Sequence, residues 1–195
     1  MNHRLKCGCG KVEGYVALPG VATRAVCYCK DCQAFARFLD RADRVLDSQG
    51  GTGIVATLPR QVVFTSGAQN IACMSLSARG MLRWYASCCN TPIGNTPRDA
   101  KISYVGLVDD CLAREALDAS FGAVRMVLNT RSANGEPKPA QRSGLFAMIG
   151  IMKAVIGSRL SGAYRRNPFF SADGRPIAEP RELSKDERAH FTEAA

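Results

Sequence analysis

The chain has 195 residues, of which 46% are hydrophobic, and 26 Lys or Arg stand against 17 Asp or Glu. This length and composition allow one good-sized domain with a buried core, or one such domain with an appendage. The formal net charge of +9 falls to about +6 if seven thiolates bind two zinc ions, so we expect no nucleic-acid partner.

The nine cysteines are unusually many for this length. Tight cysteine groups in a mid-sized chain indicate metal sites, whereas secreted disulfide frameworks usually spread cysteines along short chains. The N-terminus carries no apolar run before the first cysteine pair, which predicts the absence of a secretory signal. No stretch approaches the roughly 18 apolar residues of a membrane span. We therefore expect a cytoplasmic protein.

The first cysteine group is Cys7-Gly8-Cys9-Gly10. Its glycines permit the tight backbone that would let two near-adjacent sulfurs face one ion. The residues that follow, up to Val16, alternate between apolar and polar, as in a half-buried strand. A turn at Pro19-Gly20 precedes a short predicted strand, Thr23–Val26, which leads into the second group.

The second group, Cys27, Cys29 and Cys32, has the spacing C-x-C-x-x-C. Three sulfurs are one short of a closed tetrahedral zinc site, and catalytic zinc sites often have three protein ligands and one open position. Clustered soft thiolates favour zinc. Two other interpretations stay open: a redox pair formed by Cys29 and Cys32, and three small buried hydrophobic residues. Residues Gln33–Leu39 have helical composition.

Several short β-like runs follow at close spacing, separated by turn signals. Many short strands at this interval predict an antiparallel, mainly β domain; the runs are Ile54–Thr57, Gln61–Thr65, Ile71–Leu76, Met81–Ala86 and Ile102–Val108. The third group, Cys88-Cys89, ends one of these runs. Adjacent strand residues point to opposite faces, so both sulfurs reach one metal only if the chain turns there. Together with Cys7 and Cys9 they would complete a closed, structural Cys₄ set. Cys73 and Cys111 stand alone and are interpreted as core residues.

These motifs resemble those of the glutathione-dependent formaldehyde-activating enzyme family, whose domain also occurs in centromere protein V. Members combine a C-x-C-G motif, a C-x-C-x-x-C motif and, after several strands, a C-x-x-C-G knuckle. The first two match here, and Cys89-Asn90-Thr91-Pro92-Ile93 resembles the end of the knuckle. The chain departs from the family at Ala86, where the other knuckle cysteine is expected, so Cys88 is the candidate substitute. The resemblance covers about residues 5–108.

The resemblance implies a small zinc-binding β-sandwich with one structural zinc and a second, open zinc held by Cys27, Cys29 and Cys32. It also implies a glutathione-type thiol as substrate in the formation or cleavage of a carbon–sulfur bond. Lys30 and Arg37 are candidates to contact the carboxylates of such a thiol. The departure at Ala86 marks the chain as a divergent member.

Beyond the resemblance, a helix is expected around Leu112–Ala119 and a strand over Ala123–Leu128. We divide the chain into a zinc-binding β domain (1–128), a linker (129–141) and a helical, basic C-terminal extension (142–195). Apolar residues from Leu145 to Leu160 fall at helical spacing, and no acidic residue lies between Glu136 and Asp173. Such a helix can lie on an anionic membrane; we favour packing against its own domain or a second subunit. Ser184 to Glu187 has the spacing of a capping box.

Two functional hypotheses follow from these motifs and from the resemblance. The first is a zinc-dependent, carbon–sulfur lyase-like enzyme for glutathione or a related small thiol and its aldehyde adduct, with up to two Zn²⁺. The second is a non-catalytic, zinc-stabilised binding module that uses the C-terminal helix for a protein or membrane-surface partner. In that case Cys73 or Cys111 would supply a fourth sulfur to the central site.

Overall fold

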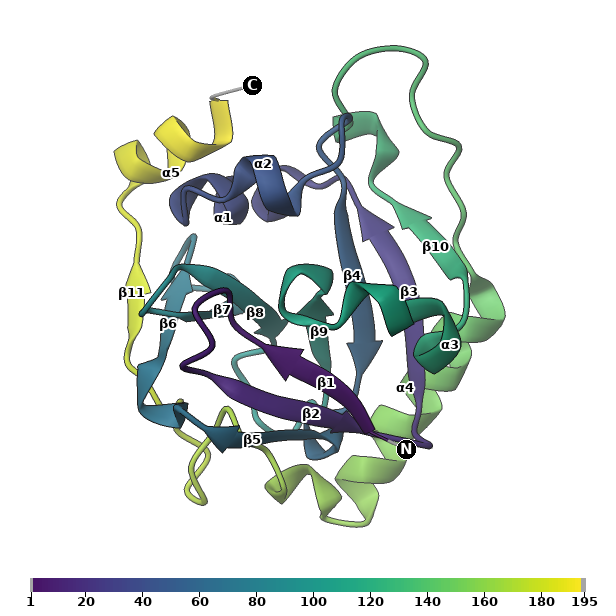
Figure 1. Cartoon of the computed structure of the whole chain (residues 1–195), viewed down its shortest axis with the longest axis vertical. Helices are drawn as coiled ribbons and strands as arrows, with labels where there is room; N and C mark the ends of the chain where they lie inside the picture. Colours follow the sequence, from purple (N-terminus) through teal and green to yellow (C-terminus); the bar gives the residue numbers. More distant parts are fainter. Residues whose placement is uncertain (1, 194–195) are drawn as a thin grey trace.

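The fold is built on two β-sheets, which the computed structural model describes over residues 2–193 (Figure 1). The smaller sheet is antiparallel, in the order β1 (Asn2–Lys6), β2 (Glu13–Ala17) and β5 (Val62–Ser66). The larger sheet has eight strands, in the order β10 (Val124–Leu128), β3 (Ala22–Cys27), β4 (Thr52–Thr57), β9 (Val105–Val108), β8 (Thr91–Thr96), β7 (Leu82–Ala86), β6 (Ile71–Ser75) and β11 (Pro180–Glu182). The predicted mainly β architecture is confirmed.

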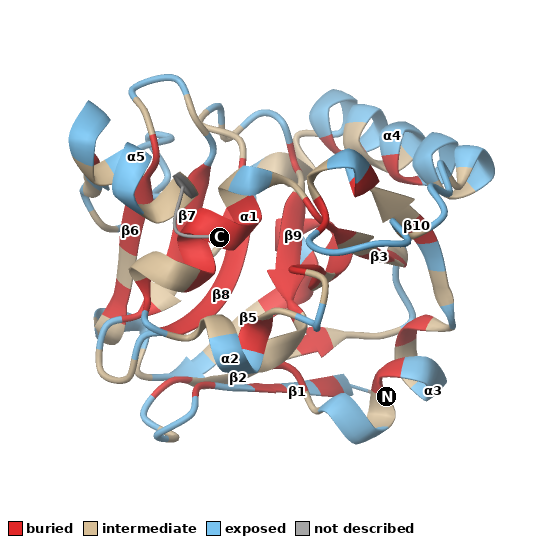
Figure 2. Ribbon diagram, turned by 90° about the horizontal axis from the view of Figure 1, so that it is seen from above, coloured by how far each residue is buried: buried red, intermediate tan, exposed pale blue. Residues whose placement is uncertain are grey.

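Helices complete the molecule, and three of them lie on the side of the large sheet that faces away from the small sheet (Figure 2). These three are α1 (Lys30–Phe38), α4 (Leu145–Leu160) and α5 (Lys185–Glu193), and two shorter helices are α2 (Ala42–Val45) and α3 (Leu117–Phe121). Short 3₁₀ turns lie at Pro59–Gln61, Ala68–Asn70, Asp109–Cys111, Arg114–Ala116, Thr130–Ser132 and Ala163–Arg165. No helix of residues 2–193 is long and apolar enough to cross a membrane.

The main core lies between the two sheets, where the alternating pattern of each strand turns its apolar side chains inward. Val55, Leu107 and Trp84 come from the large sheet, and they pack in one cluster with Leu5 and Val16 of the small sheet. The indole of Trp84 is fully buried and donates a hydrogen bond to the Thr96 hydroxyl at 2.9 Å. The opposite face of the large sheet is therefore free to carry the helices and, at one end, a group of cysteines.

The expectation of an antiparallel sheet is wrong at its two edges, where β10 pairs with β3 and β11 pairs with β6 in parallel. Both edge strands arrive through long connections that include helices or loops, and a parallel partner requires such a crossover. β8 is also a strand that the sequence does not predict, because Asn90-Thr91-Pro92 is typical of a turn. Of the predicted strand Ile102–Val108, only Val105–Val108 is a strand in the structure.

The C-terminal part of the chain contributes more to the fold than a helical extension would. Phe169 and Phe170 lie in the main core, where both pack against Trp84. β11 then extends the large sheet, and the expected capping box begins α5: the Ser184 hydroxyl accepts from the Glu187 amide at 3.1 Å, while the Glu187 carboxylate accepts from the Ser184 amide at 2.9 Å. Residues beyond 141 thus belong to the same core as residues before 129.

Candidate metal centres

Four sulfurs from two distant segments converge at one end of the core. Cys7 and Cys9 follow β1, and Cys88 and Cys89 occupy the turn between β7 and β8. The Sγ atoms of Cys9 and Cys88 are 3.4 Å apart, those of Cys7 and Cys9 are 3.7 Å apart, and Cys88 lies 3.9 Å from both Cys7 and Cys89. A tetrahedral zinc ion with bonds of about 2.3 Å holds its sulfurs about 3.8 Å apart. The donor set therefore fits one zinc ion.

Two tight backbone turns bring these sulfurs together. The Cys7 amide donates to the Val12 carbonyl at 2.9 Å, and the Val12 amide donates to the Cys7 sulfur at 3.2 Å. In the other segment Asn90 has a φ of 53°, a left-handed conformation that asparagine tolerates better than most residues. The Gly8 amide joins the segments by donating to the Thr91 hydroxyl at 2.9 Å. Both sulfurs of the Cys88-Cys89 pair consequently face the same point.

The protein environment already favours negative charge at this site. Burial raises the pKa of Cys89, but hydrogen bonds from the Thr91 hydroxyl and from the backbone and thiol of Cys9 outweigh it and lower the pKa to about 6. The pKa of Cys88 is raised to about 12, first by burial and then by its thiol neighbours. Zinc binds cysteine as the thiolate, so Cys89 is favoured as a ligand before a cation arrives, whereas Cys88 would release its proton on binding.

The second group of sulfurs lies at a corner between a strand and a helix. Cys27 is the last residue of β3, Cys29 is the N-cap of α1, and Cys32 lies in the first turn of that helix. The Cys29 sulfur accepts a hydrogen bond from the Cys32 amide at 3.4 Å. The three Sγ atoms all lie within 4.8 Å of one another. The corner thus turns a C-x-C-x-x-C sequence into a three-sulfur cluster that could hold a metal ion.

Negative charge is stabilised at this cluster as well. Hydrogen bonds from Cys29 and then Cys32 lower the pKa of Cys27 far below its ordinary value, and burial of the thiol only partly opposes this. The Asn129 side-chain amide, which follows β10, donates to the Cys27 sulfur at 3.3 Å. The helix N-terminus adds a partial positive charge. Asn129 was not identified from the sequence, because only the parallel pairing of Leu128 with Cys27 brings it there.

No fourth sulfur completes this cluster within residues 2–193. Cys73 projects from β6 into the core between the sheets, and the Cys111 thiol donates to the backbone carbonyls of Val108 and Ile93. Burial raises the pKa of Cys73 to about 12, and it raises that of Cys111 as well. Both are core residues, as predicted. The three-sulfur cluster therefore has one ligand position without a protein sulfur.

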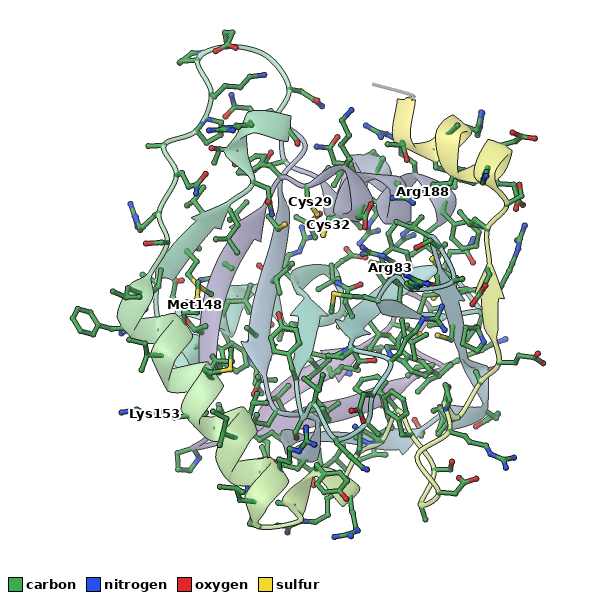
Figure 3. All side chains as sticks on the ribbon, turned by 180° about the vertical axis from the view of Figure 1, so that it is seen from behind. Cys29, Cys32, Arg83, Met148, Lys153 and Arg188 are labelled. Carbon is green, nitrogen blue, oxygen red and sulfur yellow. The ribbon has the colours of Figure 1, made fainter. Side chains whose placement is uncertain are left out.

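The strand register places further polar side chains on the sheet face that carries Cys27. Successive antiparallel pairs align Ile54 with Val108, Ala56 with Gly106, Gly106 with Asn95, and Asn95 with Arg83. Arg83 is buried, donates to the side-chain oxygen (Oδ1) of Asn95 at 3.1 Å and lies 3.7 Å from the Asp31 carboxylate. Figure 3 shows Arg83 on this side of the sheet, below α1, and Cys29 and Cys32 at the N-terminal end of that helix. A single arginine in an otherwise ordinary strand gave no signal in the sequence.

Tyr104 lies on the same face, near the three sulfurs. A side chain at Gly106 would meet the Tyr104 hydroxyl at 3.0 Å and Ile54 at 3.1 Å, and Ile54 packs against Cys27 and Cys32. Burial, and after it the charges of the cysteine cluster, raise the pKa of Tyr104 to about 12. The phenol is therefore a neutral hydrogen-bond donor at physiological pH.

The two basic residues proposed from the sequence have different positions. Lys30 is exposed at the first position of α1, next to Cys29, and forms no ion pair within the described chain. Arg37 instead donates to the Phe191 carbonyl at 2.9 Å and to the Gln33 side chain at 3.1 Å, and so fixes α5 to α1. Of the two, only Lys30 is an exposed neighbour of a residue in the three-sulfur cluster.

Comparison with known proteins gives a family and a distant structural likeness. The crystal structure of a Rhodobacter sphaeroides protein aligns with 65% of this chain and 99% of its own, at 19% identity and a TM-score of 0.40. No curated protein matches the chain. The profile of a family of unknown function, DUF6151, matches residues 2–181. The chain therefore belongs to the family of unknown function DUF6151.

Proposed function

We propose that the protein is a zinc-dependent, carbon–sulfur lyase-like enzyme that acts on glutathione or a related small thiol and its aldehyde adduct. The observation that carries the proposal is the contrast between two clusters: four sulfurs in one and three in the other. A closed set is typical of structural zinc, and three ligands with an open position are typical of catalytic zinc. The alternative interpretation, a redox pair of Cys29 and Cys32, gives no part to Cys27, which lies in the same cluster.

The reaction requires no outside oxidant. A thiol–aldehyde adduct is a hemithioacetal; when its carbon–sulfur bond breaks, the hydroxyl proton leaves, the carbon becomes a carbonyl and the sulfur takes a proton. When bound, zinc would supply a Lewis acid that lowers the pKa of a thiol or polarises a carbonyl. Every electron pair stays within the adduct and the released products.

The residues of the site have distinct parts in this proposal. Cys27, Cys29 and Cys32 would hold the ion, and Asn129 fixes the orientation of the Cys27 sulfur through its hydrogen bond. The Tyr104 phenol can donate a hydrogen bond to a sulfur or oxygen of the substrate. Lys30 offers an unpaired ammonium group at the exposed edge, which suits a substrate carboxylate.

The proposal is tested by thiol binding to the zinc-loaded protein and to Cys29→Ser. Calorimetry in buffers of different ionisation enthalpy should show proton release when glutathione binds to the wild type, because a thiol coordinated to zinc is deprotonated. Cys29→Ser should lose one zinc equivalent, keep the fold and bind the thiol at least tenfold more weakly. Equal binding by both proteins, or no binding by the wild type, contradicts the proposal.

A matched pair of ligands tests the part assigned to Lys30. Lys30→Gln should weaken the binding of glutathione, which carries carboxylates, and leave the binding of 2-mercaptoethanol unchanged. Lys185→Gln, an exposed lysine on α5, is the control. Parallel losses for both thiols would show that Lys30 acts on the metal site and not on the carboxylates.

A further inference from the structure

The helix α4 exposes an unusual amount of apolar surface. Seven of the eleven large hydrophobic side chains that are exposed in the described chain belong to this one helix: Leu145, Phe146, Met148, Ile149, Met152, Ile156 and Leu160. Phe146 is 88% exposed and Leu160 is 83% exposed. Isolated exposed hydrophobic residues are normal, but a contiguous patch marks an interaction surface.

The helix is attached to the sheet by a narrow side only. Ile151 and Ser158 are its buried residues, and Figure 3 shows Met148 directed toward the sheet and Lys153 directed away from the molecule. Between α4 and the sheet lies an open, apolar hollow of about 340 Å³, whose lining includes Met148, Met152 and Ile102. The exposed apolar surface therefore continues from the outer face of α4 into this hollow.

The chain segment that contains α4 carries charges of one sign. From residue 137 to residue 172 the chain has six basic residues and no acidic one. Lys153 and Arg159 are exposed on the helix itself, and no ion pair involves them within residues 2–193. Arg60 and Arg166 lie beside the C-terminal half of the helix, and the backbone of the exposed residue Arg125 adjoins Gly144 at its N-terminus. Arg165 is a lesser contributor, because it shares a hollow with Asp99 and Asp173.

We propose that α4 docks flat on an anionic lipid bilayer, with its exposed apolar residues in the interface. At 16 residues the helix is about 24 Å long, too short to span a bilayer but suited to lie in its surface. Phe146, Ile149 and Leu160 are seven, four and seven residues from Lys153, so they share its outward stripe. Lys153 can extend its ammonium group to the phosphates while its stem remains in apolar surroundings. A second copy packed on this stripe would bring like charges together, which disfavours a dimer.

The test is co-sedimentation of the full chain with vesicles of phosphatidylcholine, alone or mixed with phosphatidylserine. We expect the wild type to bind the mixed vesicles and to be released by salt, because screening weakens the attraction of exposed charges. Phe146→Ser should weaken binding at least tenfold, since burying a large apolar side chain contributes about 1.5–3 kcal/mol. Lys153→Glu should weaken it at least fivefold, since one basic residue near such a surface contributes about 1 kcal/mol.

Two controls separate docking from general effects. Met81→Ser removes an exposed apolar residue outside α4, and Lys185→Glu reverses a charge on α5; both should bind vesicles as the wild type does. Circular dichroism should show that the α4 variants remain folded. The proposal would be overturned by binding without preference for phosphatidylserine, by equal binding of Phe146→Ser and the wild type, or by no vesicle binding of the wild type. In the last case, sedimentation as a dimer would assign the surface to a second copy.

Discussion

The four-sulfur centre yields the sharpest prediction, because it connects two parts of the fold. Cys7 and Cys9 follow β1 of the small sheet, whereas Cys88 and Cys89 follow β7 of the large sheet. An ion at this point would clamp one sheet to the other. We expect Cys88→Ser and Cys89→Ser to lose this ion equally, because the Cys88 sulfur lies within 3.9 Å of all three partners. The resemblance to the C-x-x-C-G knuckle would by itself favour only Cys89 as a ligand.

The magnitude follows from the coupling of metal binding to folding. Structural zinc sites contribute roughly 10–16 kcal/mol in small peptides, so removing one of four ligands costs on the order of 3 kcal/mol. Domains of this size are stable by about 5–15 kcal/mol, and the core between the sheets remains intact. Each variant should therefore fold, but it should unfold at a markedly lower denaturant concentration than the wild type.

Denaturant unfolding and elemental analysis, each with and without a chelator, provide the assay. The wild type should hold up to two zinc ions and each variant one fewer, and the difference in free energy of unfolding should disappear once the chelator has removed the metal from all proteins. If Cys88→Ser retains the metal content and stability of the wild type while Cys89→Ser loses both, then Cys88 is not a ligand and the geometric reasoning fails. A difference that persists unchanged in chelator would show that the thiols act through packing alone.

Two further predictions concern stability away from the metal centres. Burial lowers the pKa of His3, whose ring packs on Phe121. The contribution of neutral His3 to the free energy of unfolding is therefore fully present above about pH 6.5 and is lost as the pH falls through the folded-state pKa. His3→Gln should flatten this part of the curve of unfolding free energy against pH, and a slope equal to that of the wild type would contradict the prediction. Gly67 has a φ of +72°, and an added side chain would lie 1.9 Å from the Lys11 carbonyl oxygen, so Gly67→Ala should cost at least about 2 kcal/mol in urea unfolding. Gly150→Ala, in open space on α4, should instead stabilise by about 0.5–1 kcal/mol; equal effects of the two changes would refute the argument from backbone strain.

Local features of the chain were largely determined by the sequence. Alternating apolar residues specified most of the strands, and helical spacing specified α4, because both signals depend only on which side chains share one face. The C-x-C-x-x-C spacing likewise predicted one sulfur cluster, since its three cysteines lie within six residues and a single corner unites them. The capping box at Ser184 could also be predicted, because its two hydrogen bonds join residues only three positions apart.

Only the tertiary structure determined what depends on distant pairings. The sequence grouped Cys88 and Cys89 with Cys7 and Cys9, but only the backbone turn at Asn90 brings both adjacent sulfurs to one point. Asn129 reaches Cys27 through a parallel strand pair, and Arg83 comes to the same sheet face through the register of five strands. The sequence predicted that α4 is rich in apolar residues, but not that its outer surface is exposed to solvent. Periodicity shows that a helix has apolar residues, whereas the packing of the whole chain decides which of them remain in contact with solvent.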